Sequence, residues 1–208
     1  MVAKTGLVAV ARSPSTIKPE VPMVHIHTLW LPILLSSVIV FVVSALIHMV
    51  LGYHANDFHK LQDEDDVAEA LRRFKIVPGE YMLPKAGSPK EMKTPEFQEK
   101  WKKGPRAILN IFPDGTVSMT SSLVLWFLYC ILIGIFAAYI SGRALGPGVG
   151  YLSVFRFVGF TAFACYVVGG WQASIWFRRS WVTTLKNTID GLVYALLTAG
   201  TFGWLWPK

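Results

Sequence analysis

Four long apolar runs limit what this chain can fold into. Each is about 20 residues or longer, the length that a helix needs to cross a hydrocarbon core of about 30 Å. They occupy residues 27–52, 121–142, 152–172 and 183–207. A backbone surrounded by lipid must satisfy its own hydrogen bonds, so such runs favour helices over irregular structure. The sequence therefore predicts an all-α integral membrane protein built as a bundle of four transmembrane helices.

Composition and charge placement agree with this prediction. Hydrophobic residues make up 53% of the 208 residues, and the mean hydropathy is +0.44. The net charge is +7, but bases and acids number 11 each between Asp57 and Asp114. Elsewhere only Glu20 and Asp190 are acidic, so the excess positive charge flanks the apolar runs. That placement suits a bilayer with anionic headgroups and argues against nucleic acid, which would require a basic soluble surface.

Small residues recur at every fourth position of the second and fourth runs, which places them on one helix face. They are Gly134, Ala138 and Gly142 in the second run, and Gly191, Ala195, Ala199 and Gly203 in the fourth. Such faces let another helix backbone approach closely, so we expect them to be packing seams. They exceed what one four-helix bundle needs. We therefore also expect contacts with other membrane subunits or with a second copy of the chain.

Two segments are expected outside the membrane. Residues 1–26 predict an extended tail, and residues 53–120 predict a small α+β segment between the first and second helices. In the latter, acids at 63–66 followed by bases at 72–75 favour one short helix. Thr94 before Pro95 favours the start of a second. The residues from Ala107 to Phe112 and from Thr116 to Met119, around a Pro-Asp-Gly turn, predict a β-hairpin.

All five histidines fall in one short window around the first run. Two lie at its start and three near its far end, so the groups are separated by roughly a membrane thickness. They are His25 and His27 in the first group, and His48, His54 and His59 in the second. The second group, with Asp57, could supply imidazole and carboxylate ligands to zinc, copper or iron. The alternative is one histidine in helix packing and two in interfacial loops.

Asp190 is the second candidate site residue, at the entrance of the fourth run. An acid at the edge of a membrane span is costly, which makes it a functional hypothesis. It could take part in a proton or ion relay with Lys186 or with His48. The alternative is an acid near a helix start, satisfied by backbone amides and the positive end of the dipole, or by Arg178 or Arg179.

Sequence motifs for catalysis are lacking: we find no phosphate-binding glycine loop, nucleophile elbow or HExxH. The expected function is therefore that of a non-catalytic accessory or scaffold subunit of a membrane complex, and no cofactor can be assigned. Two alternatives stay open. One is a redox or metal-handling protein that uses His48, His54 and His59, and the other is a small proton-coupled carrier centred on Asp190.

The runs SALIHMVLGYHANDF, WFLYC and LKNTIDGLVYALLTAGTFGWLWP resemble a family of small, uncharacterised bacterial multi-pass membrane proteins. The resemblance spans roughly residues 28 to 207. It implies a location in the bacterial plasma membrane. Because that family has no assigned activity, it implies no functional residue.

Four crossings place both chain ends on the same side of the membrane. Arg178, Arg179 and Lys186 lie between the third and fourth runs, and the positive-inside rule assigns that loop and residues 53–120 to the cytoplasm. Both termini are then expected on the non-cytoplasmic side. The bases of the tail favour the opposite orientation; they are Lys4, Arg12 and Lys18.

Overall fold

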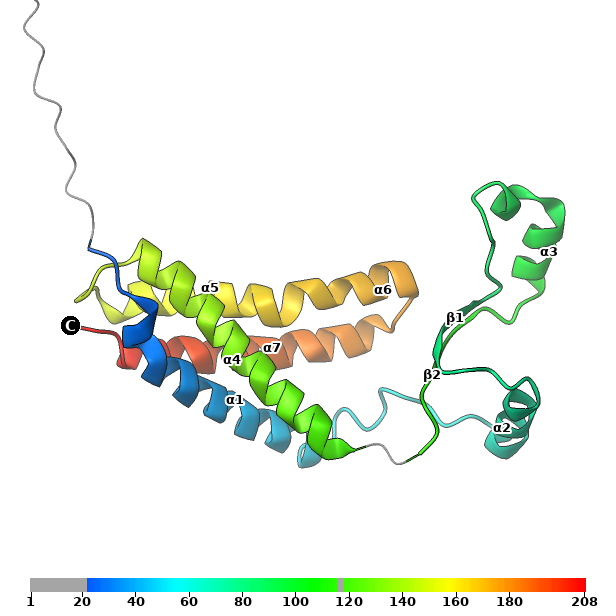
Figure 1. Cartoon of the computed structure of the whole chain (residues 1–208), viewed down its shortest axis with the longest axis horizontal. Helices are drawn as coiled ribbons and strands as arrows, with labels where there is room; N and C mark the ends of the chain where they lie inside the picture. Colours follow the sequence, from blue (N-terminus) through cyan, green and yellow to red (C-terminus); the bar gives the residue numbers. More distant parts are fainter. Residues whose placement is uncertain (1–21, 116–117) are drawn as a thin grey trace, which may run out of the picture.

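The computed structural model describes residues 22–115 and 118–208. Long helices form a bundle, and a smaller unit with two short helices and two strands lies beyond one end of it (Figure 1). Of the tail predicted at residues 1–26, residues 1–21 lie outside the described part of the chain. The remainder leads into a short 3-10 helix, Ile26–Leu29, and then into α1, Trp30–Met49.

Within residues 22–115 and 118–208, three helical segments are long and apolar enough to cross a membrane, which supports a multi-pass helical membrane protein. They are Ile26–Met49, Met119–Ala144 and Tyr151–Phe177. The second is α4; the third comprises α5, Tyr151–Val167, a 3-10 turn and α6, Trp171–Phe177. The remaining long helix, α7, Trp181–Trp204, has 24 residues but is not among the three. Its threonines, glycines, Lys186 and Asp190 lower its hydropathy, so four crossings are not confirmed.

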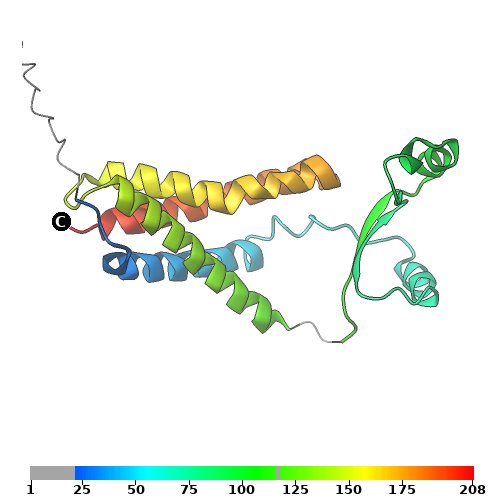
Figure 2. The same cartoon turned by 45° about the horizontal axis from the view of Figure 1, so that its top comes forward.

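The surface of α7 is arranged with polar groups inside and apolar groups outside. The helix runs antiparallel to α5 and also packs against α1 (Figures 1 and 2). The polar residues on its buried side are Thr183, Thr184, Asp190, Thr198 and Thr201. The apolar residues on its exposed side include Val182, Leu185, Ile189, Leu192 and Leu196. Buried threonines such as Thr198 donate to the carbonyl four residues earlier, which satisfies their hydroxyls within the helix.

The small residues of α4 lie against α1 and the segment that precedes it. Gly134 faces Ile33, where an added methyl carbon would lie 3.2 Å from the Ile33 side chain. Further along, Val24 donates its N–H to the carbonyl of Gly142 at 2.9 Å, and a side chain at Gly142 would collide with the Val24 carbonyl. Ala138, between them, is fully buried.

The small residues of α7 lie against α5 in the same way. Gly191 faces Val167, and Gly203 faces the ring of Tyr151. Ala195 and Ala199 are buried between them. Both sets of small residues are therefore covered by helices of the same chain, and they do not by themselves call for a partner subunit.

The unit outside the bundle contains the two short helices predicted from capping signals. They are α2, Glu64–Arg73, and α3, Pro95–Lys103. The hydroxyl of Thr94 accepts from the N–H of Phe97, as its position before Pro95 predicts.

The strand pairing differs from the predicted hairpin. Strand β2, Ala107–Ile111, pairs antiparallel with β1, Gly79–Leu83, and α3 lies between the two strands in the chain. Of the other predicted strand, Thr116 to Met119, residues 116–117 lie outside the described part, and Met119 begins α4.

Candidate metal site at one end of the bundle

A tight turn after α1 brings three polar side chains onto α7. Gly52 has a φ of +65°, a left-handed conformation that glycine adopts without strain. The chain then folds back through turns in which Ala55 donates to the Gly52 carbonyl and Asp57 to the His54 carbonyl, each at 3.0 Å. This loop places Tyr53, His54 and Asp57 beside Lys186 and Asp190.

His48, His54 and Asp190 form one cluster. Each offers a possible ligand atom, and these atoms all lie within 4.8 Å of one another. The Nε2 atom of His54 is 2.8 Å from Oδ2 of Asp190. The imidazoles of His48 and His54 are stacked, with centroids 4.6 Å apart and planes 4° from parallel. The second histidine group and Asp190, which the sequence analysis connected only through a relay of Asp190 with His48, therefore meet at one point.

Both imidazoles have their Nδ1 atoms held by acceptors. His48 Nδ1 lies 3.0 Å from the carbonyl of Ser44, and His54 Nδ1 lies 2.6 Å from a carboxylate oxygen of Asp57. A carbonyl can only accept, so His48 must donate from Nδ1, and its Nε2 is left with the free lone pair when the ring is neutral. Metal-binding histidines are oriented in this way, by a carbonyl or carboxylate on the nitrogen that does not bind the metal.

Asp190 and Lys186 are connected through the loop after α1. Asp190 is 3% exposed, and the hydroxyl of Tyr53 donates to its Oδ1 atom. Lys186 Nζ lies 2.7 Å from Oδ1 of Asp57 and 2.6 Å from the Tyr53 carbonyl. The predicted pairing of Lys186 with Asp190 thus runs through Asp57 and His54.

Asp57 is the charged centre of this connection. Hydrogen bonds from His54 and then from Lys186 lower the pKa of its carboxyl below the ordinary value. Asp57 is therefore a carboxylate at neutral pH. It is the acceptor that fixes the ring of His54.

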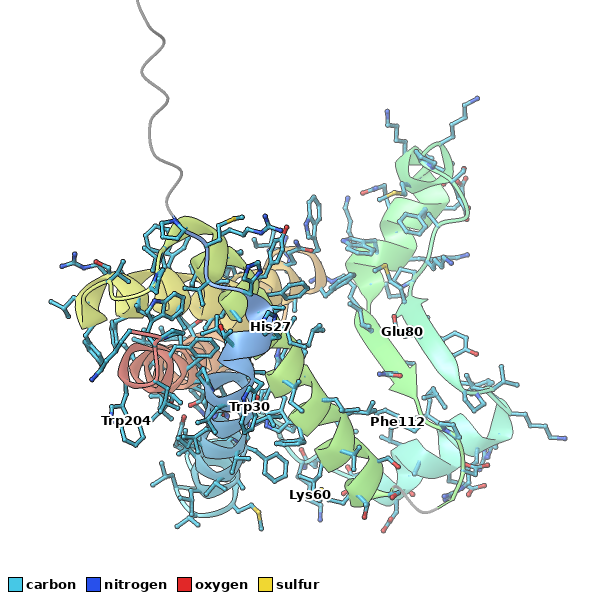
Figure 3. All side chains as sticks on the ribbon, turned by 60° about the vertical axis from the view of Figure 1, so that its left-hand side comes forward. His27, Trp30, Lys60, Glu80, Phe112 and Trp204 are labelled. Carbon is cyan, nitrogen blue, oxygen red and sulfur yellow. The ribbon has the colours of Figure 1, made fainter. Side chains whose placement is uncertain are left out.

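The other histidines lie away from this cluster. His59 is exposed and is not a member of the cluster formed by the described residues. His25 and His27 stack on each other, with centroids 5.5 Å apart, at the opposite end of α1. Figure 3 shows His27 at one end of α1 and Lys60, the neighbour of His59, towards the other. The separation of the histidines into two groups agrees with the length of that helix.

A cavity of about 200 Å³ adjoins the cluster. It is lined by His48, Trp126, Tyr129, Tyr166, Asn187, Asp190, Gly191 and Tyr194. The hydroxyl of Tyr194 is buried and has no hydrogen-bond partner within residues 22–115 and 118–208. Sequence reasoning did not single out Tyr194, although its position four residues after Asp190 places both on one face of α7.

Comparison with protein families, curated proteins and solved structures finds no match to this chain. The resemblance to an uncharacterised bacterial family therefore stays a prediction. Any functional inference must come from the geometry of the site.

Proposed function

We propose that His48, His54 and Asp190 bind a divalent transition metal ion of the zinc type at the end of the bundle. Two imidazoles and one carboxylate form a ligand set that suits zinc or iron. The observation that carries the proposal is that both rings have Nδ1 anchored, by Ser44 and by Asp57, so each would bind the ion through Nε2, the atom that in His54 lies 2.8 Å from Oδ2 of Asp190. This is the metal-handling alternative of the sequence analysis, with Asp190 in the place of His59.

The burial of Asp190 also favours a bound cation. A buried carboxylate is unfavourable unless it is paired or coordinates a metal. Tyr53 donates to Oδ1, whereas Oδ2 faces His54. Three protein ligands leave one position of a tetrahedral ion open, as in catalytic rather than structural zinc sites. The adjoining cavity, lined by His48 and Asp190, would give a small molecule access to that position.

Metal content and affinity test the proposal. We expect the protein purified in mild detergent to bind about one Zn²⁺ ion per chain, and His48→Ala and Asp190→Asn to lose this stoichiometric binding. His59→Ala is the matched control, since it removes an exposed histidine outside the cluster. Equal losses in His48→Ala and His59→Ala, or no saturable binding by the wild type, would overturn the proposal.

A proton relay is the second candidate, favoured by one observation. An unbroken chain of contacts runs from Asp190 to His54 at 2.8 Å, to Asp57 at 2.6 Å and to Lys186 at 2.7 Å. Its outer end is partly exposed, since the side chain of Lys186 is 22% accessible. A relay predicts proton flux in metal-free vesicles that Asp190→Asn abolishes. Flux that is the same with and without that substitution removes this candidate.

The accessory or scaffold role stays a prediction. It was expected from the surplus of small-residue faces, and the faces on α4 and α7 are occupied by α1 and α5. We therefore place metal binding ahead of it.

We also propose that α7 crosses the membrane as a fourth span in the bacterial plasma membrane. Its exposed side is apolar, and its polar groups face the bundle. Two hydrogen bonds join the segment after α7 to the loop between α4 and α5. Gly148 donates its N–H to the Pro207 carbonyl at 2.9 Å, and the indole N–H of Trp206 donates to the Gly146 carbonyl at 3.0 Å. Val24 is bonded to Gly142 at the same end. Figure 1 shows the C-terminus at the end where α1 begins.

Reporter fusions at the two termini test this topology. Four spans predict both reporters on the same side, and the charge distribution of the loops predicts the non-cytoplasmic side. Reporters on opposite sides of the membrane would contradict the fourth span.

A further inference from the structure

Two hollow spaces meet at His48. One is the cavity described above, which we call the aromatic cavity. The other, which we call the apolar groove, has a volume of about 540 Å³ and lies between α1 and α4. Its lining includes Phe41, Ser44, Ala45, His48, Leu123 and Trp126. His48 and Trp126 line both spaces and form the wall between them.

The aromatic cavity has the size and lining for one flat ring. A cavity of about 150 Å³ holds a benzene molecule, so about 200 Å³ has room for one substituted six-membered ring. Four aromatic side chains of its lining contact one another, with centroids between 5.5 and 6.3 Å apart. They are Trp126, Tyr129, Tyr166 and Tyr194. Aromatic walls of this kind favour a flat, unsaturated ligand through offset and edge contacts.

Hydrogen-bonding groups inside the cavity call for oxygen atoms on that ring. Tyr194 is 4% exposed, and its hydroxyl has no partner among the described residues. A buried polar atom without a partner is uncommon in a native protein, and a bound ligand is one explanation of it. Tyr194 can donate to a carbonyl oxygen of the ring, whereas His48, whose Nδ1 is bonded to the Ser44 carbonyl, offers Nε2 as an acceptor.

The apolar groove suits a hydrocarbon chain. Figure 2 shows that α4 crosses α1 obliquely rather than running parallel to it. Phe41, Ala45 and Leu123 belong to membrane-spanning segments, so the groove faces lipid rather than water. Trp126 is fixed at its inner wall by a 2.8 Å bond to the hydroxyl of Ser44. A chain lying in this groove would leave the protein directly into the bilayer.

We propose that the two spaces together bind a membrane-soluble quinone, with its ring in the aromatic cavity and its isoprenoid tail in the apolar groove. One ring oxygen accepts from Tyr194, and the tail passes His48 into the lipid. Phospholipid is the weaker fit, because its headgroup is neither flat nor small enough for a cavity bounded by four rings. Binding of the ring does not require the metal ion, so this inference stands apart from the proposed metal site.

Two quinones that differ only in the tail provide the test: a methoxy-substituted benzoquinone without a tail, and decylubiquinone. Their affinities are measured on the full chain in nanodiscs, with and without added Zn²⁺, and metal content is determined on the same samples. The variants are Tyr194→Phe, which removes only the hydroxyl, and Ala45→Trp, which fills the groove. Leu196→Phe is the control, at an exposed position of α7 outside both linings.

We expect saturable binding of both quinones by the wild type. Tyr194→Phe should weaken both by about threefold to tenfold, the effect of one neutral hydrogen bond. Ala45→Trp should weaken only decylubiquinone, and Leu196→Phe should change neither. Binding that never saturates, or that responds to none of these variants, means partition into lipid and overturns the inference. The inference would also be overturned if neither quinone displaced the other and phospholipid remained bound in the groove. The metal measurement decides the proposed function independently of these results.

Discussion

The substitution Asp57→Asn tests how the site holds His54. Asp57 accepts from His54 through Oδ2 and from Lys186 through Oδ1. An asparagine keeps only one acceptor oxygen and presents an NH₂ group to the second donor, so it cannot serve both. The ring of His54 then loses either its hydrogen bond or the carboxylate that makes it a stronger ligand.

The expected effect is a tenfold to hundredfold loss of metal affinity. Removing an outer-shell carboxylate from a metal-bound histidine typically has this effect, which corresponds to about 1.4–2.7 kcal/mol. The hydrogen bond between His54 and Asp57 leads to a similar figure. One hydrogen bond to a charged group contributes about 1.5–3 kcal/mol, and the partly exposed Lys186 recovers much of its lost contact from water.

The assay is competition between the protein and a chelator of known affinity for Zn²⁺, in detergent at neutral pH. Asp66→Asn is the matched control, since Asp66 is an exposed acid on α2. Thermal unfolding of each variant shows that it remains folded. An affinity for Asp57→Asn within twofold of the wild type would refute the role of Asp57 in orienting His54.

Three further predictions follow from the packing and charges. Gly191→Ala should lower the free energy of unfolding by about 1–3 kcal/mol, because the new methyl group would overlap Val167. Gly169→Ala should have little effect, because no other atom lies near that position. Thermal unfolding in detergent compares the two variants. The pKa of Asp57 is lowered by folding, so its contribution to stability is complete above the ordinary pKa of about 3.9 and is lost as the pH falls through the folded value. The difference in unfolding temperature between the wild type and Asp57→Asn should therefore persist from about pH 7 to pH 5 and shrink only below about pH 4; a difference that vanishes by pH 5 contradicts this. Tyr53→Phe should weaken Zn²⁺ binding by about tenfold or less, since it removes one donor from Asp190 but no ligand, and loss of all binding would show that Tyr53 is itself a ligand.

The apolar runs were sufficient to predict the long helices. Hydropathy and length located the segments that became α1, α4 and α5, because a helix in lipid is defined by these properties alone. Capping signals located α2 and α3, since Thr94 and the acids after Asp63 act within one turn. The partner of β2 was missed because strand pairing depends on contacts between distant segments. The sequence offered a nearby turn, while the true partner, β1, lies before α3.

The candidate site was predicted in pieces. His48, His54, Lys186 and Asp190 were each identified as chemically unusual in their surroundings. They meet because the turn at Gly52 directs the chain after α1 back onto α7. The residues that contact one another there are more than 130 positions apart in the sequence. His59 lies only five residues after His54, yet it is beyond that turn and remains exposed. Proximity in sequence predicted three histidines together, and tertiary packing replaced one of them with Asp190.

X-ray absorption at the zinc edge, on protein in nanodiscs with one equivalent of Zn²⁺, tests the metal site most directly. We predict two imidazole nitrogens and one carboxylate oxygen at about 2.0–2.1 Å, with one imidazole lost in His48→Ala. An ion surrounded by oxygen atoms alone would contradict the account. So would a spectrum that His48→Ala leaves unchanged but that replacement of His25 and His27 alters.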